Sequence, residues 1–246
     1  MQHRSKKIKK SFFIILVVLI VLSGGSAIYL GNYYHSVDVE KYMNGSSEVS
    51  VEKFDKGWFF DGAGEEKALI FYPGAKVATE AYAPLMYQLT ESGIDCFLVD
   101  MPFHMAFFGM NRAEEIMQEY NYEAWYLGGH SLGGAMAANF AADYVEDHTD
   151  GIRGLLLLAA YPTKDLSTSD MSVVIVYGSE DGVLNMDKIV AGRELMPQDY
   201  KEVCIEGGNH AQFGSYGTQK GDGTAAIPAE EQWARTVEVF VGDESE

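Results

Sequence analysis

Cysteine, proline and basic residues are all scarce in this chain of 246 residues, and each scarcity excludes a class of protein. The two cysteines, Cys96 and Cys204, provide neither the spacing of metal ligands nor a disulfide-rich framework. Six prolines together with 13 % aromatic residues argue against a disordered or fibrous chain. Lys and Arg number 18 against 36 Asp and Glu, so the net charge of −18 would repel nucleic-acid phosphates. We therefore expect no nucleic-acid partner.

Motifs for metals and nucleotides are also missing. No H-E-x-x-H sequence and no cluster of His and Cys occurs, and no G-x-G-x-x-G or phosphate-binding loop is present. We expect neither a metal nor a cofactor. What the chain does have is 47 % hydrophobic residues, enough for one globular domain with a sizeable core.

The amino terminus carries a long apolar segment. Five of the 18 basic residues lie in residues 1–10, and no acidic residue precedes Asp38. The 19 residues 12–30 then rise about 1.5 Å each as a helix, nearly the thickness of a hydrocarbon core of about 30 Å. This predicts a transmembrane signal anchor over 11–30, with the basic flank 1–10 in the cytoplasm and the remainder outside the cell membrane. A cleaved signal peptide is the alternative, because residues 12–22 have the length of its apolar region and Gly25-Ser26-Ala27 resembles a cleavage site; the protein would then be secreted.

Strands alternate with helices over residues 49–246, and the polar residues 31–48 before them predict a tether. Unbroken apolar runs, such as residues 68–72 ended by Pro73-Gly74, are typical of parallel strands that are buried on both faces. We therefore expect one α/β domain with a mostly parallel central sheet and helices on both faces. The predicted strands are 49–53, 57–61, 68–72, 96–99, 124–128, 155–159, 173–177 and 201–205, and the predicted helices are 77–92, 111–120, 131–145, 184–195 and 229–241.

Ser131 stands in a sequence typical of an activated nucleophile. Gly129-His130-Ser131-Leu132-Gly133 fits G-x-S-x-G between a predicted strand and an alanine-rich helix, the context of a nucleophile elbow. The glycines are needed because a Cβ in this crowded turn would strike a neighbouring strand or helix. The alternative is a glycine-rich turn whose serine only caps the helix.

A serine hydroxyl needs a base to take its proton and an acid to orient that base. Asp181 follows one predicted strand, and His210, the only histidine after it, follows the next. The chain order Ser131, Asp181, His210 is that of α/β-hydrolases. Glu180 is the competing acid.

An oxyanion hole requires two backbone donors. We expect one from the amide of Leu132, directly after the nucleophile, and the other from Ala75 in the turn after residues 68–72, with Lys76 as the next choice. The Lys76 side chain either attracts an anionic substrate group or is simply solvated.

Four segments together resemble a known family. They are Phe71-Tyr72-Pro73-Gly74-Ala75-Lys76-Val77, Met101-Pro102-Phe103, Gly129-His130-Ser131-Leu132-Gly133-Gly134 and Gly207-Gly208-Asn209-His210-Ala211-Gln212-Phe213-Gly214. In this set the chain resembles the bacterial α/β-hydrolase fold-5 family, related to the dienelactone hydrolases, over residues 49–241. The resemblance implies the α/β-hydrolase fold, with Ser131 as nucleophile, Asp181 as acid and His210 as base. In that fold's usual strand order Cys96 and Cys204 are not neighbours, so we expect two buried free thiols.

The loop of residues 159–171 is short where many lipases carry a helical cap, so we expect a minimal cap and an open site. Residues 101–112 are then a candidate pocket wall, in which Phe103 and Phe107 would receive an apolar group; the alternative is an apolar helix packed in the core. Lys76 and His104 are the other two candidate pocket residues. The alternative for His104 is a packed or exposed histidine without a role in binding. We expect His130 to be a packing residue.

These observations predict a serine hydrolase that acts on a small-molecule carboxylic ester, with a thioester or an amide as alternatives. The same three residues would also suit an acyltransferase. A catalytically silent domain that binds a partner at the cell surface is the alternative from another class.

Overall fold

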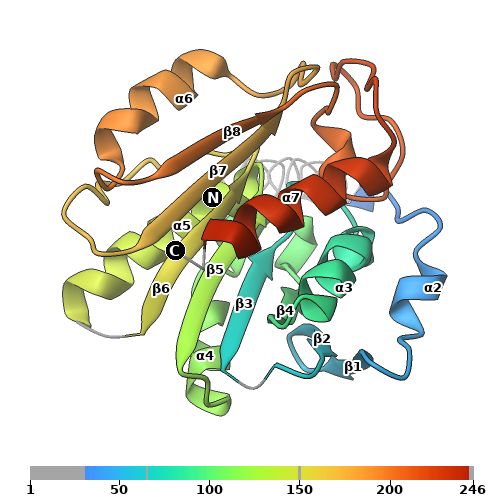
Figure 1. The fold of residues 1–246 in the computed structure, drawn as a ribbon, viewed down its shortest axis with the longest axis horizontal. Coiled ribbons are helices and arrows are strands. Elements are labelled where there is room, and N and C mark those ends of the chain that lie inside the picture. The colour runs from blue at the N-terminus through green and yellow to red at the C-terminus, as the bar shows by residue number, and fades with distance from the viewer. Residues whose placement is uncertain (1–30, 65, 149–150, 244–246) are drawn as a thin grey trace, which may run out of the picture. The chain divides into compact units, whose positions relative to one another are not determined.

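The computed structural model describes residues 31–64, 66–148 and 151–243 (Figure 1). The predicted basic flank and signal anchor lie outside the described residues. Among the residues that are described, no helix has both the length and the hydropathy that a membrane crossing requires. A compact unit extends from Tyr34 to the carboxyl terminus, and it carries the candidate site.

An eight-stranded sheet forms the centre of this unit, with the strand order β1-β2-β4-β3-β5-β6-β7-β8. The β1–β2 and β2–β4 pairs are antiparallel, and every other neighbouring pair is parallel. The strands are β1 (Ser50–Phe54), β2 (Gly57–Asp61), β3 (Lys67–Tyr72), β4 (Asp95–Val99), β5 (Ala124–His130), β6 (Ile152–Leu158), β7 (Ser172–Gly178) and β8 (Lys201–Ile205).

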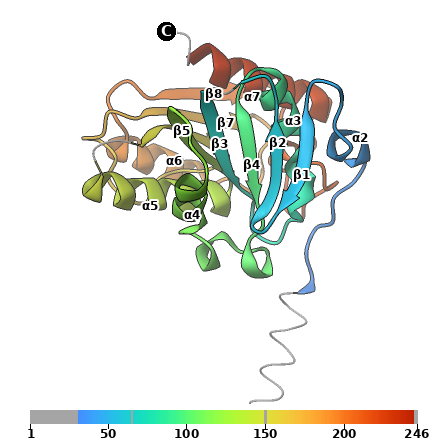
Figure 2. The same cartoon turned by 90° about the horizontal axis from the view of Figure 1, so that it is seen from below.

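Helices cover both faces of the sheet, as Figure 2 shows with α3 and α7 above it and α4, α5 and α6 below. Leu69 and Phe71 point into the core under α3 and α7, whereas Ile70 and Tyr72 point to the other side. Because both faces are buried, the β3 sequence has no polar alternation. The helices are α2 (Glu40–Met43), α3 (Ala83–Glu91), α4 (Arg112–Glu119), α5 (Leu132–Asp147), α6 (Met186–Gly192) and α7 (Ala229–Asp243).

All eight predicted strands and all five predicted helices are present, and two of the helices differ from the prediction by more than their exact bounds. The predicted helix over 77–92 is divided into a 3₁₀ turn at Thr79–Tyr82 and α3, because Pro84 fits only the first turn of an α-helix. The predicted helix over 184–195 starts at Met186, where the Asn185 side chain accepts a hydrogen bond from the Lys188 amide as the N-cap. The connection between β6 and β7, residues 159–171, contains no helix, in agreement with a minimal cap.

Cys96 and Cys204 are free thiols, but only Cys96 is buried. The expectation for Cys204 was wrong because β8 is the edge strand of the sheet, where neighbouring elements cover one side of the strand less completely. Cys96 lies on β4 in the interior of the sheet.

The segment predicted as a tether packs on the domain from Tyr34 onward. The Tyr34 amide donates to the Lys76 carbonyl (2.7 Å), and the Val37 amide donates to the Ser215 carbonyl (2.8 Å). In α2 the buried ring of Tyr42 packs edge-on against Trp233 of α7. Residues 34–48 therefore form part of the compact unit.

Candidate active site

Ser131 occupies a strained turn between β5 and α5. Its φ of 54° and ψ of −121° are unfavourable for a residue with a side chain, so the surroundings must hold it in place. The Ser131 amide donates to the Leu158 carbonyl of β6 at 2.8 Å. A Cβ on Gly133 would lie 2.1 Å from the Tyr72 carbonyl oxygen, and one on Gly129 would lie 2.6 Å from the Gly133 backbone. The glycines thus let β3, β5 and α5 meet closely under the serine.

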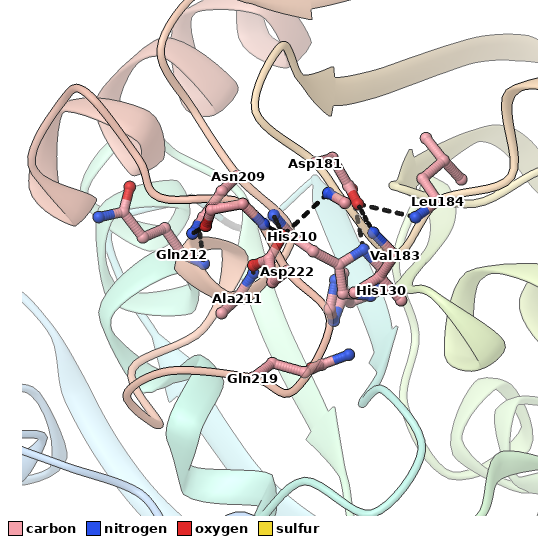
Figure 3. A network of polar contacts seen from close by, with 12 residues as sticks. His130, Asp181, Val183, Leu184, Asn209, His210, Ala211, Gln212, Gln219 and Asp222 are labelled. Atoms are coloured by element: carbon pink, nitrogen blue, oxygen red, sulfur yellow. Dashed lines mark hydrogen bonds and ion pairs between the residues drawn. The ribbon is translucent and has the colours of Figure 1, made fainter.

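His210 and Asp181 form a buried hydrogen-bonded pair (Figure 3). His210 Nδ1 lies 2.8 Å from Asp181 Oδ2, and both side chains are only 2 % exposed. The other carboxylate oxygen, Oδ1, accepts the amides of Val183 at 2.9 Å and Leu184 at 2.7 Å. With the carboxylate fixed in this way, Nδ1 carries the ring proton and Nε2 is left as an acceptor. The competing acid, Glu180, is exposed and accepts the Ser179 hydroxyl instead.

A second carboxylate, that of Asp222, holds the backbone of the same two loops and was not found from the sequence. It accepts the amides of His210 (3.2 Å), Ala211 (2.8 Å) and Gly182 (3.1 Å). Figure 3 shows both carboxylates beside His210. Asp222 therefore ties the loop after β8 to the loop after β7. The sequence signal, a Gly-Asp-Gly triplet before α7, is too common to identify such a contact.

The two amides expected to form the oxyanion hole belong to segments that lie against each other. Leu132 is the first residue of α5, where an amide has no acceptor within the helix. The close approach of Gly133 to the Tyr72 and Pro73 carbonyls places the turn after β3 at the same helix end. The Lys76 amide donates to the His104 carbonyl at 2.7 Å, which leaves Ala75 as the better donor. Among the described residues, the Ala75 amide has no acceptor.

A buried tyrosine links this turn to the residue before the nucleophile. The Tyr82 hydroxyl accepts the Gly74 amide at 3.0 Å and shares a hydrogen bond of 2.8 Å with His130 Nδ1. His130 is almost completely buried between this tyrosine and the His210 ring. Burial lowers the pKa of His130 well below its ordinary value, and the neighbouring His210 ring, 4.4 Å away between centroids, acts in the same direction. His130 is thus buried as predicted, and it also joins the two sides of the site.

A pocket of about 260 Å³ opens beside Ser131 and His210. Its other lining residues come from three places: the start of α5, the end of β6 with its following loop, and the loop before α6. They are Leu132, Ala135, Ala159, Ala160, Tyr161, Val183, Leu184 and Asn185. Lys76, Phe103, His104 and Phe107, the candidate pocket residues, are not among them, so a role for these four in binding substrate stays a prediction.

Residues 101–112 do not form the apolar core helix that we considered as the alternative. They form two 3₁₀ turns, Pro102–His104 and Ala106–Phe108, before α4 begins at Arg112. Phe103 is 58 % exposed and Phe107 is 47 % exposed, so neither side chain belongs to the core. The backbone carbonyl of His104 instead supports the turn that carries Ala75.

The fold and the site together define an α/β-hydrolase. The sheet has the strand order given above, and the serine, the carboxylate and the histidine follow the carboxyl ends of β5, β7 and β8. Comparison with known sequences gives the family directly: the profile of the alpha/beta hydrolase family matches residues 68–234, and the chain belongs to this family. No curated protein matches the chain.

Solved structures share the fold at low sequence identity. A carboxyl esterase 2 from the mycorrhizal fungus Tuber melanosporum is 13 % identical, with a TM-score of 0.60 over 85 % of this chain and 89 % of the other. A monoacylglycerol lipase from Paleococcus ferrophilus is 14 % identical, with a TM-score of 0.57 over 80 % and 99 %. A thermostable esterase from Pseudomonas putida ECU1011 is 16 % identical, with a TM-score of 0.55 over 83 % and 85 %.

Proposed function

We propose that the protein is a serine hydrolase that cleaves a carboxylic ester through an acyl-enzyme intermediate. Ser131 is the nucleophile, His210 the base and Asp181 the acid that orients it. The observation that supports this most is the buried 2.8 Å bond between Asp181 and His210, because His210 lines the same pocket as Ser131. It leaves Nε2 of the ring as the atom that takes the serine proton.

The reaction follows from these positions. Ser131 Oγ attacks the acyl carbon while its proton passes to His210 Nε2, and the amides of Leu132 and Ala75 donate to the developing oxyanion. The bond to the alcohol oxygen then breaks, and His210 gives its proton to the leaving alcohol. Water attacks the acyl-enzyme in the same manner, so that one ester and one water yield one acid and one alcohol without a cofactor.

Two observations support this substrate class, the first for the kind of bond that is cleaved and the second for the size of the group beside it. The structures that share the fold include esterases and a monoacylglycerol lipase. The pocket of about 260 Å³ is slightly smaller than the usual range of about 300–1,000 Å³ for ligand pockets, and alanine and leucine side chains form much of its wall. We therefore propose a short, apolar acyl or alcohol group in this pocket.

We test the nucleophile by labelling the full chain, solubilised in mild detergent, with a fluorophosphonate probe. Wild type is compared with Ser131→Ala, His210→Ala and the matched control Ser92→Ala, an exposed serine at the end of α3. We expect label to be lost in Ser131→Ala and strongly reduced in His210→Ala, and to persist in the control. Hydrolysis of p-nitrophenyl acetate should fall at least ~10³-fold in both site variants. A folded wild type that takes no label contradicts the proposal and favours the silent binding domain.

We further propose that the domain works on the outer side of the cell membrane, held by a signal anchor over residues 11–30. The two cysteines offer a test, because only Cys204 is exposed. In spheroplasts of an expressing host, a membrane-impermeant maleimide should label wild type as well as it does after lysis, and should fail to label Cys204→Ser. Labelling of wild type only after lysis would place the domain inside, and a labelled protein free in the medium would indicate a cleaved signal peptide.

A further inference from the structure

Three phenylalanines on the turns between β4 and α4 form an exposed aromatic surface. Phe103, Phe107 and Phe108 are 58 %, 47 % and 52 % exposed. Their rings contact one another rather than the core, with centroids 5.6 Å apart for Phe103 and Phe108 and 4.2 Å apart for Phe107 and Phe108. Contiguous apolar groups in water are unfavourable and mark surfaces that meet a partner.

This aromatic surface lies next to the candidate active site. The His104 carbonyl accepts the amide of Lys76, the residue that follows the oxyanion donor Ala75. The turn Ala106–Phe108 also packs near α5, which begins directly after Ser131. Phe103 keeps a φ of 56°, an unfavourable conformation for a bulky residue, while its side chain remains in solvent.

The amino-terminal segment joins the domain at the same peptide. The Lys76 carbonyl accepts the Tyr34 amide at 2.7 Å, and the Tyr34 carbonyl accepts the Ala78 amide at 2.8 Å. Lys76 therefore bonds to the aromatic turns through its amide and to the first residue of the compact unit through its carbonyl. Figure 2 shows the blue segment before α2 on the side of the domain where these turns lie.

The length of chain before Tyr34 limits where a bilayer can be. The apolar segment of the sequence ends at Leu30, and four residue steps lead from there to Tyr34. At no more than about 3.6 Å per residue, they span at most ~14 Å. If residues 11–30 cross the membrane, the bilayer surface lies within that distance of Tyr34, the residue that the Lys76 peptide joins to the aromatic turns.

The charge of this region permits such contact, although the chain as a whole is strongly acidic. Residues 101–110 contain no acidic residue, and the cationic Lys76 and Arg112 lie beside them. The nearby carboxylates already have partners, since Asp100 pairs with Lys53 and Glu80 accepts from the Trp58 indole. Aromatic side chains are favoured in the interfacial region of a bilayer.

We propose that Phe103, Phe107 and Phe108 dock into the lipid bilayer beside the site, and that the substrates are esters whose apolar chain remains in that bilayer. This rests on the proposed function and narrows it to a class of substrate. The small pocket receives the short side of the ester, and the long side lies against the aromatic surface. The chemistry is unchanged: water adds across the ester bond to give an acid and an alcohol.

Docking is tested with the full chain reconstituted in phosphatidylcholine vesicles. Tryptophan fluorescence of Phe107→Trp is measured with and without brominated acyl chains, and the signal of the three native tryptophans is subtracted with wild type. The matched control is Val190→Trp, at an aliphatic side chain of α6 that is 53 % exposed. We expect brominated lipid to quench the added tryptophan of Phe107→Trp at least ~twofold more than that of Val190→Trp. Equal quenching in the two variants overturns the docking.

The substrate class is tested in the same vesicles by a ratio of two rates. One substrate is a fluorogenic oleoyl ester within the bilayer, and the other is p-nitrophenyl acetate in water. Phe103→Ser/Phe107→Ser/Phe108→Ser should lower the ratio of bilayer to water rate at least ~tenfold, whereas Val190→Ser should leave it unchanged. An unchanged ratio in the triple variant overturns the substrate class. Strong quenching in Phe107→Trp with no hydrolysis of either ester by wild type would refute the proposed function and retain the docking.

Discussion

The two sides of Ser131 are built with different kinds of bonds. The histidine side consists of the loops after β7 and β8. There two carboxylates accept backbone amides, one of them also accepts the imidazole, and the side chains of Asp181 and His210 are buried. The oxyanion side consists of the turn after β3 and the turns after β4. Backbone hydrogen bonds and one tyrosine hydroxyl support it, and its phenyl rings are exposed to solvent. The first side fixes the orientation of one ring and also lines the pocket, whereas the second carries an exposed apolar surface outside that pocket. The difference teaches that the ring whose orientation matters is held by carboxylates, and that apolar side chains are left in solvent where backbone bonds provide the support.

The largest expected effect is a loss of activity that distinguishes the two carboxylates on the histidine side, Asp181 and Asp222. Asp181→Asn should lower kcat/KM for p-nitrophenyl acetate about 10³–10⁴-fold, because an amide there no longer holds the imidazole in the useful tautomer. Asp222→Asn should cost far less activity and mainly lower the melting temperature, since Asp222 holds only backbone amides. Equal losses of activity would mean that the position of the loops matters as much as the tautomer.

A smaller effect is expected on the oxyanion side, where two buried tyrosines provide a matched pair. The Tyr82 hydroxyl accepts the Gly74 amide next to Ala75, and the Tyr72 hydroxyl accepts the Ala113 amide at the start of α4. Each Tyr→Phe change removes one buried hydroxyl and should lower the free energy of unfolding by about 1 kcal/mol. Tyr82→Phe should also lower kcat about tenfold with little change in KM, whereas Tyr72→Phe should not. If both variants keep full kcat, the hydroxyl does not position the oxyanion loop.

The last expected effect is on stability alone and concerns His130, which contacts both sides through Tyr82 and His210. Its pKa in the folded state is depressed by burial below the ordinary value of 6.5, so below that pH the unfolded chain binds a proton that the folded chain does not. The contribution of buried His130 to the free energy of unfolding is therefore intact above pH 6.5. Below that pH the free energy of unfolding falls by roughly 1 kcal/mol per pH unit. Urea unfolding from pH 7 to 5 should be less pH-dependent in His130→Gln than in wild type. A parallel pH dependence in both proteins would contradict this.

The features of the sequence that predicted the fold correctly are those that depend on near neighbours in the chain. The apolar run of β3, ended by Pro73-Gly74, marks a strand that is buried on both faces, and it was placed to within one residue. The serine between Gly129 and Gly133 was likewise recognisable, because the crowding that requires the glycines arises within a few residues.

What the sequence did not predict depends on contacts between distant segments. Asp222 bonds to Gly182, 40 residues away, and no local pattern records that contact. The apolar composition of residues 101–112 fits a core helix as well as an exposed turn, because composition alone does not tell whether other elements of the fold cover the segment. Cys204 was misplaced for a similar reason, since its exposure depends on β8 being the last strand of the sheet.

The paired bonds of the Lys76 peptide have a consequence for transplanting this domain onto another carrier. A fusion cut at residue 48, where polar composition ends, would remove Tyr34 and with it the acceptor of the Ala78 amide and the donor to the Lys76 carbonyl. The portable module therefore starts at Tyr34. A linker inserted before that residue would lengthen the reach of a carrier without altering a residue of the site.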